Sequence, residues 1–399
     1  MPVPVLARLT KLVCLSLALV LLARCAPAPP SSPTSTPEAG DTGPPLVLLY
    51  ADSSGLQMQD AATETVSTLA PDAEYTGARA LSPSGRYLAV SYASDSSRLG
   101  LIDLQSQTLQ VVHQHPDAVT YSVAWHATND TLAFGFFVPT DDGGRGTGGI
   151  RRVAPGRTST DVGCTAAREV LHWLPTGALA TRNDERLYLV DATDCATVSS
   201  LDVRKKHTLT YAADGSHLAY ILRELDYDRS AGAYVADSAL YVSAPDGDDA
   251  ELLFGDARAV RRLAWSPTGA KLAFDLRAEE TSRRRAVVHD ASQARTSYVI
   301  PSRTGSADET HPRWSPDGTR VAFLLRRETG QQAAVRVAGQ TQQLGEATGP
   351  IAGWAGSRHV VVPGPDSLRV KTLRGETVYA VPASVTYLHA VMQPRNGGA

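Results

Sequence analysis

A ten-residue motif that recurs along the chain is the strongest constraint on its fold. The clearest copy is WSPDGTRVAF at Trp314–Phe323, and a close second is WSPTGAKLAF at Trp265–Phe274. Five weaker copies share the same order of residue types and start at Leu81, Trp125, Trp173, Tyr211 and Trp354. All five tryptophans therefore occupy the first position of the motif. Successive copies start about 38 to 54 residues apart, and repeats of this length predict stacked, mutually dependent units.

Each unit has the pattern of strand, turn and strand. A mainly apolar run precedes the aromatic residue, and Ser-Pro-x-Gly then supplies turn chemistry. A short apolar run such as 271–276 follows, which predicts a strand buried on both faces. Two further strand-like segments complete the unit, for example 186–192 and 196–202. Such a four-stranded antiparallel sheet must pack against its neighbours, so we predict an all-β fold, a β-propeller of four-stranded blades.

The two ends of the repeat region are predicted to complete one blade together. The repeat region begins with a unit that has no first strand. Its second to fourth strands correspond to residues 46–51, 55–61 and 65–70. Residues 385–397 resemble a first strand with no follow-up. We therefore expect a single closed ring over residues 46–394, in which the C-terminal strand removes an exposed sheet edge. The count is eight blades, or seven if the unit at Trp173 or the region 354–394 is misassigned.

The motif WSPDG followed by a VAF or LAF strand resembles the TolB-type β-propeller repeat of bacterial envelope proteins. The resemblance covers about residues 46–394, and it implies the propeller fold and an envelope-associated role. It implies little about chemistry, because propellers support many functions. TolB has an α/β domain before its propeller, for which we expect no room in this chain, so a TolB-specific role is not implied.

The N-terminal segment predicts export and a lipid anchor. Residues 1–25 combine the positive Arg8 and Lys11 with an apolar run of signal-peptide length, 12–23. The sequence LARC that ends at Cys25 resembles a lipobox, although Arg24 departs from the usual small residue. We expect lipidation of Cys25; the alternatives are cleavage elsewhere or a retained N-terminal anchor. Residues 26–45 are rich in Pro, Ser and Thr and predict an extended spacer, and 395–399 form a tail.

Two cysteines outside the signal segment, Cys164 and Cys195, fall in neighbouring units. An exported chain meets an oxidising compartment, so this pair is a disulfide candidate, with two free thiols as the alternative. A metal site is not expected, because no CxxC motif with a nearby histidine is present.

Four polar residues are candidates for a binding site at the mouth of the propeller channel: His126, His172, Glu309 and His311. They adjoin the motif aromatics on strands predicted to be innermost, so they could converge and bind a ligand or act as acid and base. No carboxylate lies beside a ligand-spaced histidine pair within one unit, so we expect no catalytic residue, metal or cofactor.

Insertions at 138–149 and 223–237 predict hairpin loops lengthened on one face of the ring, often a binding face. The first contains GRGTGG at 144–149, which matches GxGxxG but lacks the strand-to-helix context of a dinucleotide site. The formal net charge is −3 and basic runs are short, so we expect no nucleic-acid partner.

The sequence favours a membrane-anchored, monomeric, non-enzymatic module that binds a protein, peptide or glycan in the cell envelope. The alternative is an extracytoplasmic hydrolase or lyase with its site in the propeller channel. A purely structural envelope protein is a third possibility.

Overall fold

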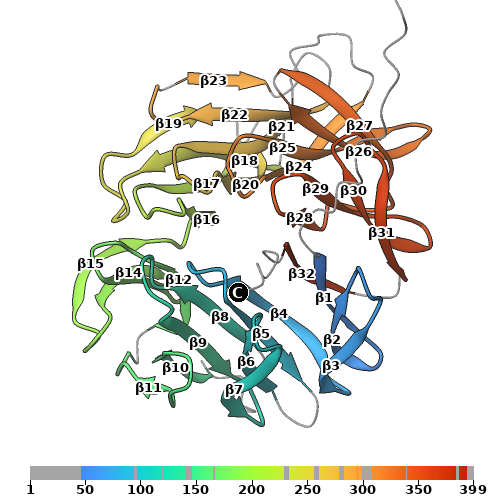
Figure 1. Ribbon diagram of the computed structural model, residues 1–399. Coiled ribbons are helices and arrows are strands. Elements are labelled where there is room, and N and C mark those ends of the chain that lie inside the picture. Colours follow the sequence, from blue (N-terminus) through green and yellow to red (C-terminus); the bar gives the residue numbers. More distant parts are fainter. Residues whose placement is uncertain are drawn as a thin grey trace, which may run out of the picture. The chain divides into compact units, whose positions relative to one another are not determined.

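The computed structural model describes residues 46–93, 97–118, 120–139, 146–164, 167–228, 233–255, 260–277, 283–293, 295–298, 307–337, 339–382 and 386–392. These residues form eight four-stranded antiparallel sheets. Figure 1 shows the sheets arranged as blades around a common centre. The predicted eight-bladed all-β propeller is confirmed, and the seven-bladed alternative is not. The predicted signal segment, with Cys25, the spacer and the tail lie outside the described residues.

In blades 2 to 8 the chain runs from the innermost strand to the outermost. Blade 2 consists of β4 (Glu74–Leu81), β5 (Tyr87–Ala93), β6 (Ser97–Asp103) and β7 (Thr108–His115). Blade 3 consists of β8 (Thr120–Trp125), β9 (Leu132–Val138), β10 (Thr147–Val153) and β11 (Thr160–Asp161). Blade 4 consists of β12 (Glu169–Trp173), β13 (Ala178–Arg182), β14 (Arg186–Asp191) and β15 (Thr197–Asp202). Blade 5 consists of β16 (Lys206–Tyr211), β17 (Leu218–Asp228), β18 (Ala233–Ser243) and β19 (Glu251–Phe254). Blade 6 consists of β20 (Arg261–Trp265), β21 (Lys271–Arg277), β22 (Arg284–Asp290) and β23 (Arg295–Tyr298). Blade 7 consists of β24 (Asp308–Trp314), β25 (Val321–Arg327), β26 (Gly330–Val337) and β27 (Gln340–Glu346). Blade 8 consists of β28 (Gly353–Ala355), β29 (His359–Pro363), β30 (Ser367–Thr372) and β31 (Thr377–Pro382).

Blade 1 is made from both ends of the repeat region, as predicted. It contains β1 (Leu46–Asp52), β2 (Gly55–Asp60), β3 (Val66–Pro71) and, innermost, β32 (Thr386–Met392). Strand β1 pairs with β32 from Leu46 opposite Met392 to Ala51 opposite Thr386. Opening the ring here would therefore break a ladder inside a blade as well as contacts between blades.

The motif forms the turn and buried strand that its residues predict. In blade 7, Gly318 adopts a left-handed φ of 66° and donates its N–H to the Ser315 carbonyl at 2.8 Å. Glycine suits this position because a side chain at positive φ is strained. The following strand β25 has five consecutive buried residues, from Val321 to Leu325. Its two faces are covered by the adjoining blades, which explains an apolar run in place of strict alternation.

The motif tryptophan connects four of the blades to the blade before them. In four blades its indole N–H donates to a backbone carbonyl on the innermost strand of the preceding blade. The pairs are Trp125 to Ala80 (2.9 Å), Trp265 to Thr210 (3.1 Å), Trp314 to Ala264 (2.9 Å) and Trp354 to Arg313 (3.3 Å). Tryptophan combines a large apolar ring with a single donor, and both are used at this junction. Trp173 differs, since its buried Nε1 has no hydrogen-bond partner among the described residues.

We expect Trp314→Phe to lower the free energy of unfolding by about 1–2 kcal/mol more than Trp173→Phe. Both changes remove a similar volume, but only the first leaves a carbonyl, that of Ala264, without its donor. Urea unfolding monitored by circular dichroism measures the difference. Equal losses of stability in the two variants would contradict a contribution from the indole hydrogen bond.

The second of the two insertions contains more β-structure than the loop that the sequence predicted. The second is mostly β-structure, because β17 and β18 are each eleven residues long and pair from Leu218 opposite Ser243 to Asp228 opposite Ala233. In the first, Val138 ends β9 and Thr147 begins β10, while 140–145 lie outside the described residues. Continued backbone pairing of β17 with β18 thus replaces most of the second predicted loop by a longer hairpin. No described helix has the length and apolar character needed to cross a bilayer.

Candidate binding site

One face of the propeller collects the features that a binding site requires. We call it the start face, because the innermost strands begin there. Each innermost strand is antiparallel to the second strand of its blade, so the hairpins joining second to third strands also lie on this face. The long hairpins β9–β10 and β17–β18 belong to this set. The prediction that both insertions lengthen the same face is therefore confirmed.

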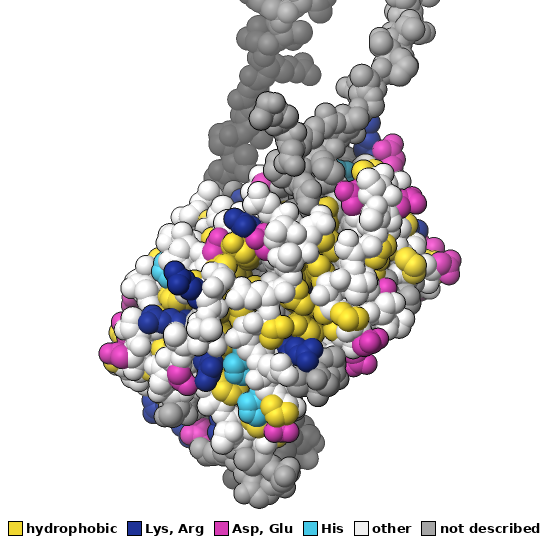
Figure 2. All heavy atoms as spheres, turned by 60° about the horizontal axis from the view of Figure 1, so that its bottom comes forward, with side chains coloured by type: hydrophobic (Ala, Val, Ile, Leu, Met, Phe, Trp, Pro, Cys, Tyr) yellow, Lys and Arg dark blue, Asp and Glu magenta, His cyan; other side chains and the backbone are white. Residues whose placement is uncertain are grey.

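Figure 2 shows positive and negative side chains interspersed around a more apolar middle on one side of the molecule. This side presents no broad area of a single charge. On this side, binding is therefore better sought in cavities, where a few polar groups converge, than on a charged surface.

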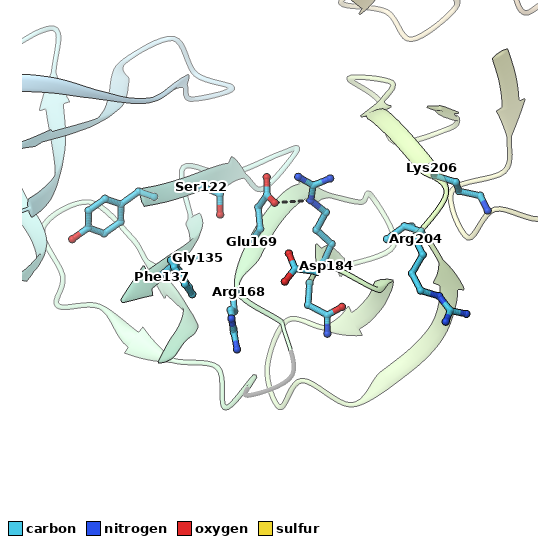
Figure 3. Close-up of a pocket in the computed structure, with 12 residues that line it drawn as sticks. Ser122, Gly135, Phe137, Arg168, Glu169, Asp184, Arg204 and Lys206 are labelled. Carbon is cyan, nitrogen blue, oxygen red and sulfur yellow. Dashed lines mark hydrogen bonds and ion pairs between the residues drawn. The ribbon is translucent and has the colours of Figure 1, made fainter. Parts of the chain in front are cut away.

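The first cavity lies on the start face between blades 3, 4 and 5 and has a volume of about 590 Å³. This volume is within the range of about 300–1,000 Å³ that is typical of ligand sites. Its walls come from β8, β9, the start of β12, the β13–β14 turn and the segment that leads into β16 (Figure 3). The lining residues are Tyr121, Ser122, Gly135, Phe137, Arg168, Glu169, Arg182, Asn183, Asp184, Val203, Arg204 and Lys206.

A close approach of two backbones forms the boundary of this cavity between blades 3 and 4. A Cβ on Gly135 would lie 2.4 Å from the Arg168 carbonyl oxygen, so only glycine fits there. Beside it the Ser122 hydroxyl oxygen accepts a hydrogen bond from the Val170 N–H at 2.8 Å. These contacts hold β8 and β12 together and fix the position of Arg168 at the edge of the cavity.

The cationic groups of the first cavity are held by nearby partners. Arg182 Nε lies 2.5 Å from Glu169 Oε2, as the dashed line in Figure 3 marks. The Arg168 guanidinium lies over the Phe137 ring, 5.3 Å from its centroid. Lys206 Nζ donates to the Asp202 carbonyl at 2.9 Å, and burial lowers the pKa of this amine. The cavity thus offers positioned donors, carboxylate acceptors and aromatic surface, a combination suited to polar ligands such as peptides and glycans.

His126 and His172, two of the four predicted site residues, lie at interblade contacts. His126 follows β8 and meets the Trp173 ring edge-on, with 4.9 Å between ring centroids. His172, on β12, stacks on Tyr211 at 5.6 Å, and burial lowers its pKa. Both lie near the ends of their innermost strands, at the turns opposite the start face.

Glu309 and His311 lie together on β24, in contact with blade 6. Glu309 is buried, 3.2 Å from Arg285 Nε, and accepts the Ala286 N–H at 3.1 Å. Burial raises the pKa of Glu309 to about 7, an effect that Arg285 only partly opposes. Burial and the charge of Arg262 lower the pKa of His311 to about 4. The four residues thus occupy three interblade contacts, and only Glu309 and His311 share one. No group of three His, Cys, Asp or Glu among the described residues is placed to hold a metal.

A bulge in the innermost strands explains the surroundings of His311. Thr208, Arg262 and His311 each lie three residues before the motif aromatic and have φ values of 53°, 56° and 58°. Pairing in β16, β20 and β24 shifts register at these positions, as expected for β-bulges, which redirect side chains. The Arg262 guanidinium reaches Asp275 Oδ2 at 3.0 Å, and Arg284 reaches Oδ1 at 2.8 Å. The Asp275 carboxylate is fully buried.

Cys164 and Cys195, the predicted disulfide pair, are bonded in the structure, with 5.3 Å between their Cα atoms. Cys164 is buried three residues after β11, in the outer part of blade 3. Cys195 lies in the turn between β14 and β15, the outer hairpin of blade 4, with a φ of 60°. The bond therefore connects the outer parts of adjacent blades.

Sequence reasoning missed the residues that line the first cavity. Arg168 directly precedes β12, and Arg204 and Lys206 lie at the approach to β16, so all three mark the beginning of an innermost strand. The signal in the sequence that could have indicated these lining residues is a cationic residue a few positions before the motif aromatic. The basic run 204–206 is short and indicates no nucleic-acid partner, and its distance from other blades cannot be read from the sequence.

Comparison with solved structures identifies the class of fold. A eukaryotic initiation factor is 13% identical over 87% of this chain and 98% of that chain, with a TM-score of 0.53. The β-propeller domain of the Trilobed protease from Pyrococcus furiosus is 12% identical over 76% and 94%, with a TM-score of 0.51. TolB from Acinetobacter baumannii is also a neighbour, at 14% identity over 88% and 67%, with a TM-score of 0.40.

Neither a protein-family model nor a curated protein matches the sequence. At such low identities the structural neighbours inform on the fold alone. The protein is a β-propeller with eight blades, and the propeller architecture supports varied functions.

Proposed function

We propose that this protein is an exported, membrane-anchored β-propeller that binds a protein, peptide or glycan of the cell envelope without catalysing a reaction. Cys25 would carry the lipid, and residues 26–45 would hold the propeller clear of the membrane. The disulfide between Cys164 and Cys195 supports an extracytoplasmic location, because such bonds persist in oxidising compartments.

The observation that carries the binding proposal is the position of the first cavity. It lies on the start face, to which the two lengthened hairpins also belong. Lengthened loops on a single face of a repeat protein are a common way to build a recognition surface. A ligand in the cavity would meet Arg168 and Asp184 while its flanking parts could contact the hairpins.

The alternative, a hydrolase or lyase, requires an acid and a base that face one cavity. Glu309, with its pKa near 7, has the acidity of a general acid, but it is buried against Arg285. In the first cavity Glu169 is paired with Arg182. These contacts favour binding over catalysis.

The proposal is tested by placing a photo-reactive amino acid at position 184, in the first cavity, in the full chain expressed in a bacterial host. Position 319, in an exposed turn opposite the start face, serves as the matched control. We expect a defined envelope adduct from position 184 and not from 319. We also expect an intact mass for the membrane fraction that begins at Cys25 and includes acyl chains, which Cys25→Ala abolishes.

Equal adducts at both positions would contradict binding at the first cavity. An unlipidated, soluble product of normal folding would contradict the anchor. The two readouts are independent, so the binding site and the anchor can be rejected separately.

A further inference from the structure

A second cavity, with a volume of about 530 Å³, lies across the ring from the first, among blades 7, 8, 1 and 2. Arg79 comes from β4, Arg313 from β24 and Tyr387 from β32, so three innermost strands contribute to it. Ile351, which precedes β28, and Leu368, on β30, supply apolar wall. The cavity therefore combines residues that are up to 308 positions apart in the chain.

The charged side chains that line this cavity are all positive. Two guanidinium groups line it, and none of the described lining residues is acidic. Elsewhere near the innermost strands, arginines face carboxylates, as Arg182 faces Glu169 and Arg262 faces Asp275. A pair of arginines that share a cavity repel one another unless an anion lies between or beside them.

The two arginines differ in their contacts. Arg79 Nη1 donates to the Tyr387 carbonyl at 2.5 Å, and its guanidinium lies 5.5 Å from the centroid of the Tyr387 ring. The Arg313 side chain makes no hydrogen bond or ion pair with the described part of the chain. Desolvation and the positive charge of Arg79 lower the pKa of Arg313. Arg313 is thus a charged group, placed by its strand beside a second cation, whose donors are available to a ligand.

We propose that the second cavity binds an organic carboxylate carried on an apolar group, with Arg313 as its main ion-pair partner. Arginine presents parallel N–H donors that match a carboxylate in a bidentate arrangement. Arg79 adds the second positive charge, and Ile351 and Leu368 contact the apolar group. The ligand is the C-terminal carboxylate of a peptide with an apolar last residue, or the carboxylate of a short acyl chain.

Several features make the wall of this cavity rigid. Pro350, Pro363 and Pro365 line it, and each has a backbone φ fixed by its ring. The Tyr387 hydroxyl donates to the Trp354 carbonyl at 3.2 Å, which joins blade 1 to blade 8 beside the cavity. A preformed wall lowers the ordering cost of binding. The site is separate from the first cavity, so it does not depend on the function proposed for that cavity.

The test is isothermal titration calorimetry of the full chain with N-acetyl-Ala-Ala-Leu, its C-terminal amide and hexanoate. We expect the free acid to bind at least about 10-fold more tightly than the amide, because a charged hydrogen-bonded pair is lost. Arg313→Gln should weaken binding of the acid by about 10-fold or more, and added salt should weaken binding to the wild-type protein. Arg374→Gln, an equal charge change at an exposed turn of blade 8, should alter the dissociation constant less than about 2-fold.

Stronger binding of the peptide acid than of hexanoate would identify a chain terminus as the ligand, and the reverse order would identify an acyl chain. No binding of either carboxylate, equal binding of acid and amide, or an unchanged dissociation constant in Arg313→Gln would overturn the proposal. The comparison of acid with amide uses the wild-type protein, so it remains decisive even if the variant fails to fold.

Discussion

Asp275→Ala is expected to lower the free energy of unfolding by about 3–5 kcal/mol, because it removes the shared partner of two cations in a buried site. Asp275 is fully buried on β21 and pairs with Arg262 and Arg284. It also accepts the His311 N–H at 3.4 Å, which ties blade 6 to blade 7. Removing it leaves both guanidinium groups without this counter-charge. Urea unfolding at neutral pH measures the loss.

The matched control is Asp202→Ala, which removes a carboxylate from the exposed pair with Arg204. Exposed ion pairs contribute about 0–1 kcal/mol, so this variant should remain near wild-type stability. If Asp275→Ala and Asp202→Ala lost similar stability, the buried network would not be a principal link between blades 6 and 7.

The double variant Cys164→Ala/Cys195→Ala is expected to lose about 2–5 kcal/mol of stability, the usual effect of removing a native disulfide. The bond spans 31 residues and connects the outer parts of blades 3 and 4. Its loss increases the conformational freedom of the unfolded chain and removes a direct connection between the two blades. Urea unfolding without reductant, compared with the wild-type protein, measures the change.

Reductant provides the internal control for the disulfide. Dithiothreitol should destabilise the wild-type protein and leave the double variant unchanged. Equal stability of the variant and the oxidised wild type would show that the bond contributes nothing measurable. Free thiols in the purified wild-type protein, detected by alkylation and mass spectrometry, would contradict the bond itself.

The sequence by itself determined the architecture, because the relevant physics is local and repeated. Ser-Pro-x-Gly specifies a turn wherever it occurs, and an apolar run such as 321–325 specifies a strand covered on both sides. Copies spaced by a blade length then leave few folds available. The repeat region begins at residue 46 with a unit that lacks its first strand, and it ends near Tyr387 with a first strand that no unit follows. Because each of the two segments needs the other to complete a blade, the sequence predicted the closure of the ring.

Only the tertiary structure decided which polar residues meet. His126, His172 and Glu309 were candidates because they adjoin the motif, yet they occupy separate interblade contacts. Arg79 and Arg313 come from opposite ends of the chain and share a cavity because ring closure places blade 2 near blade 7. The bulge that turns Arg262 toward Asp275 has no sequence signature of its own. Local patterns set which segments become strands, whereas distances between side chains depend on the ring's closure, the bulges in its innermost strands and the packing of its blades.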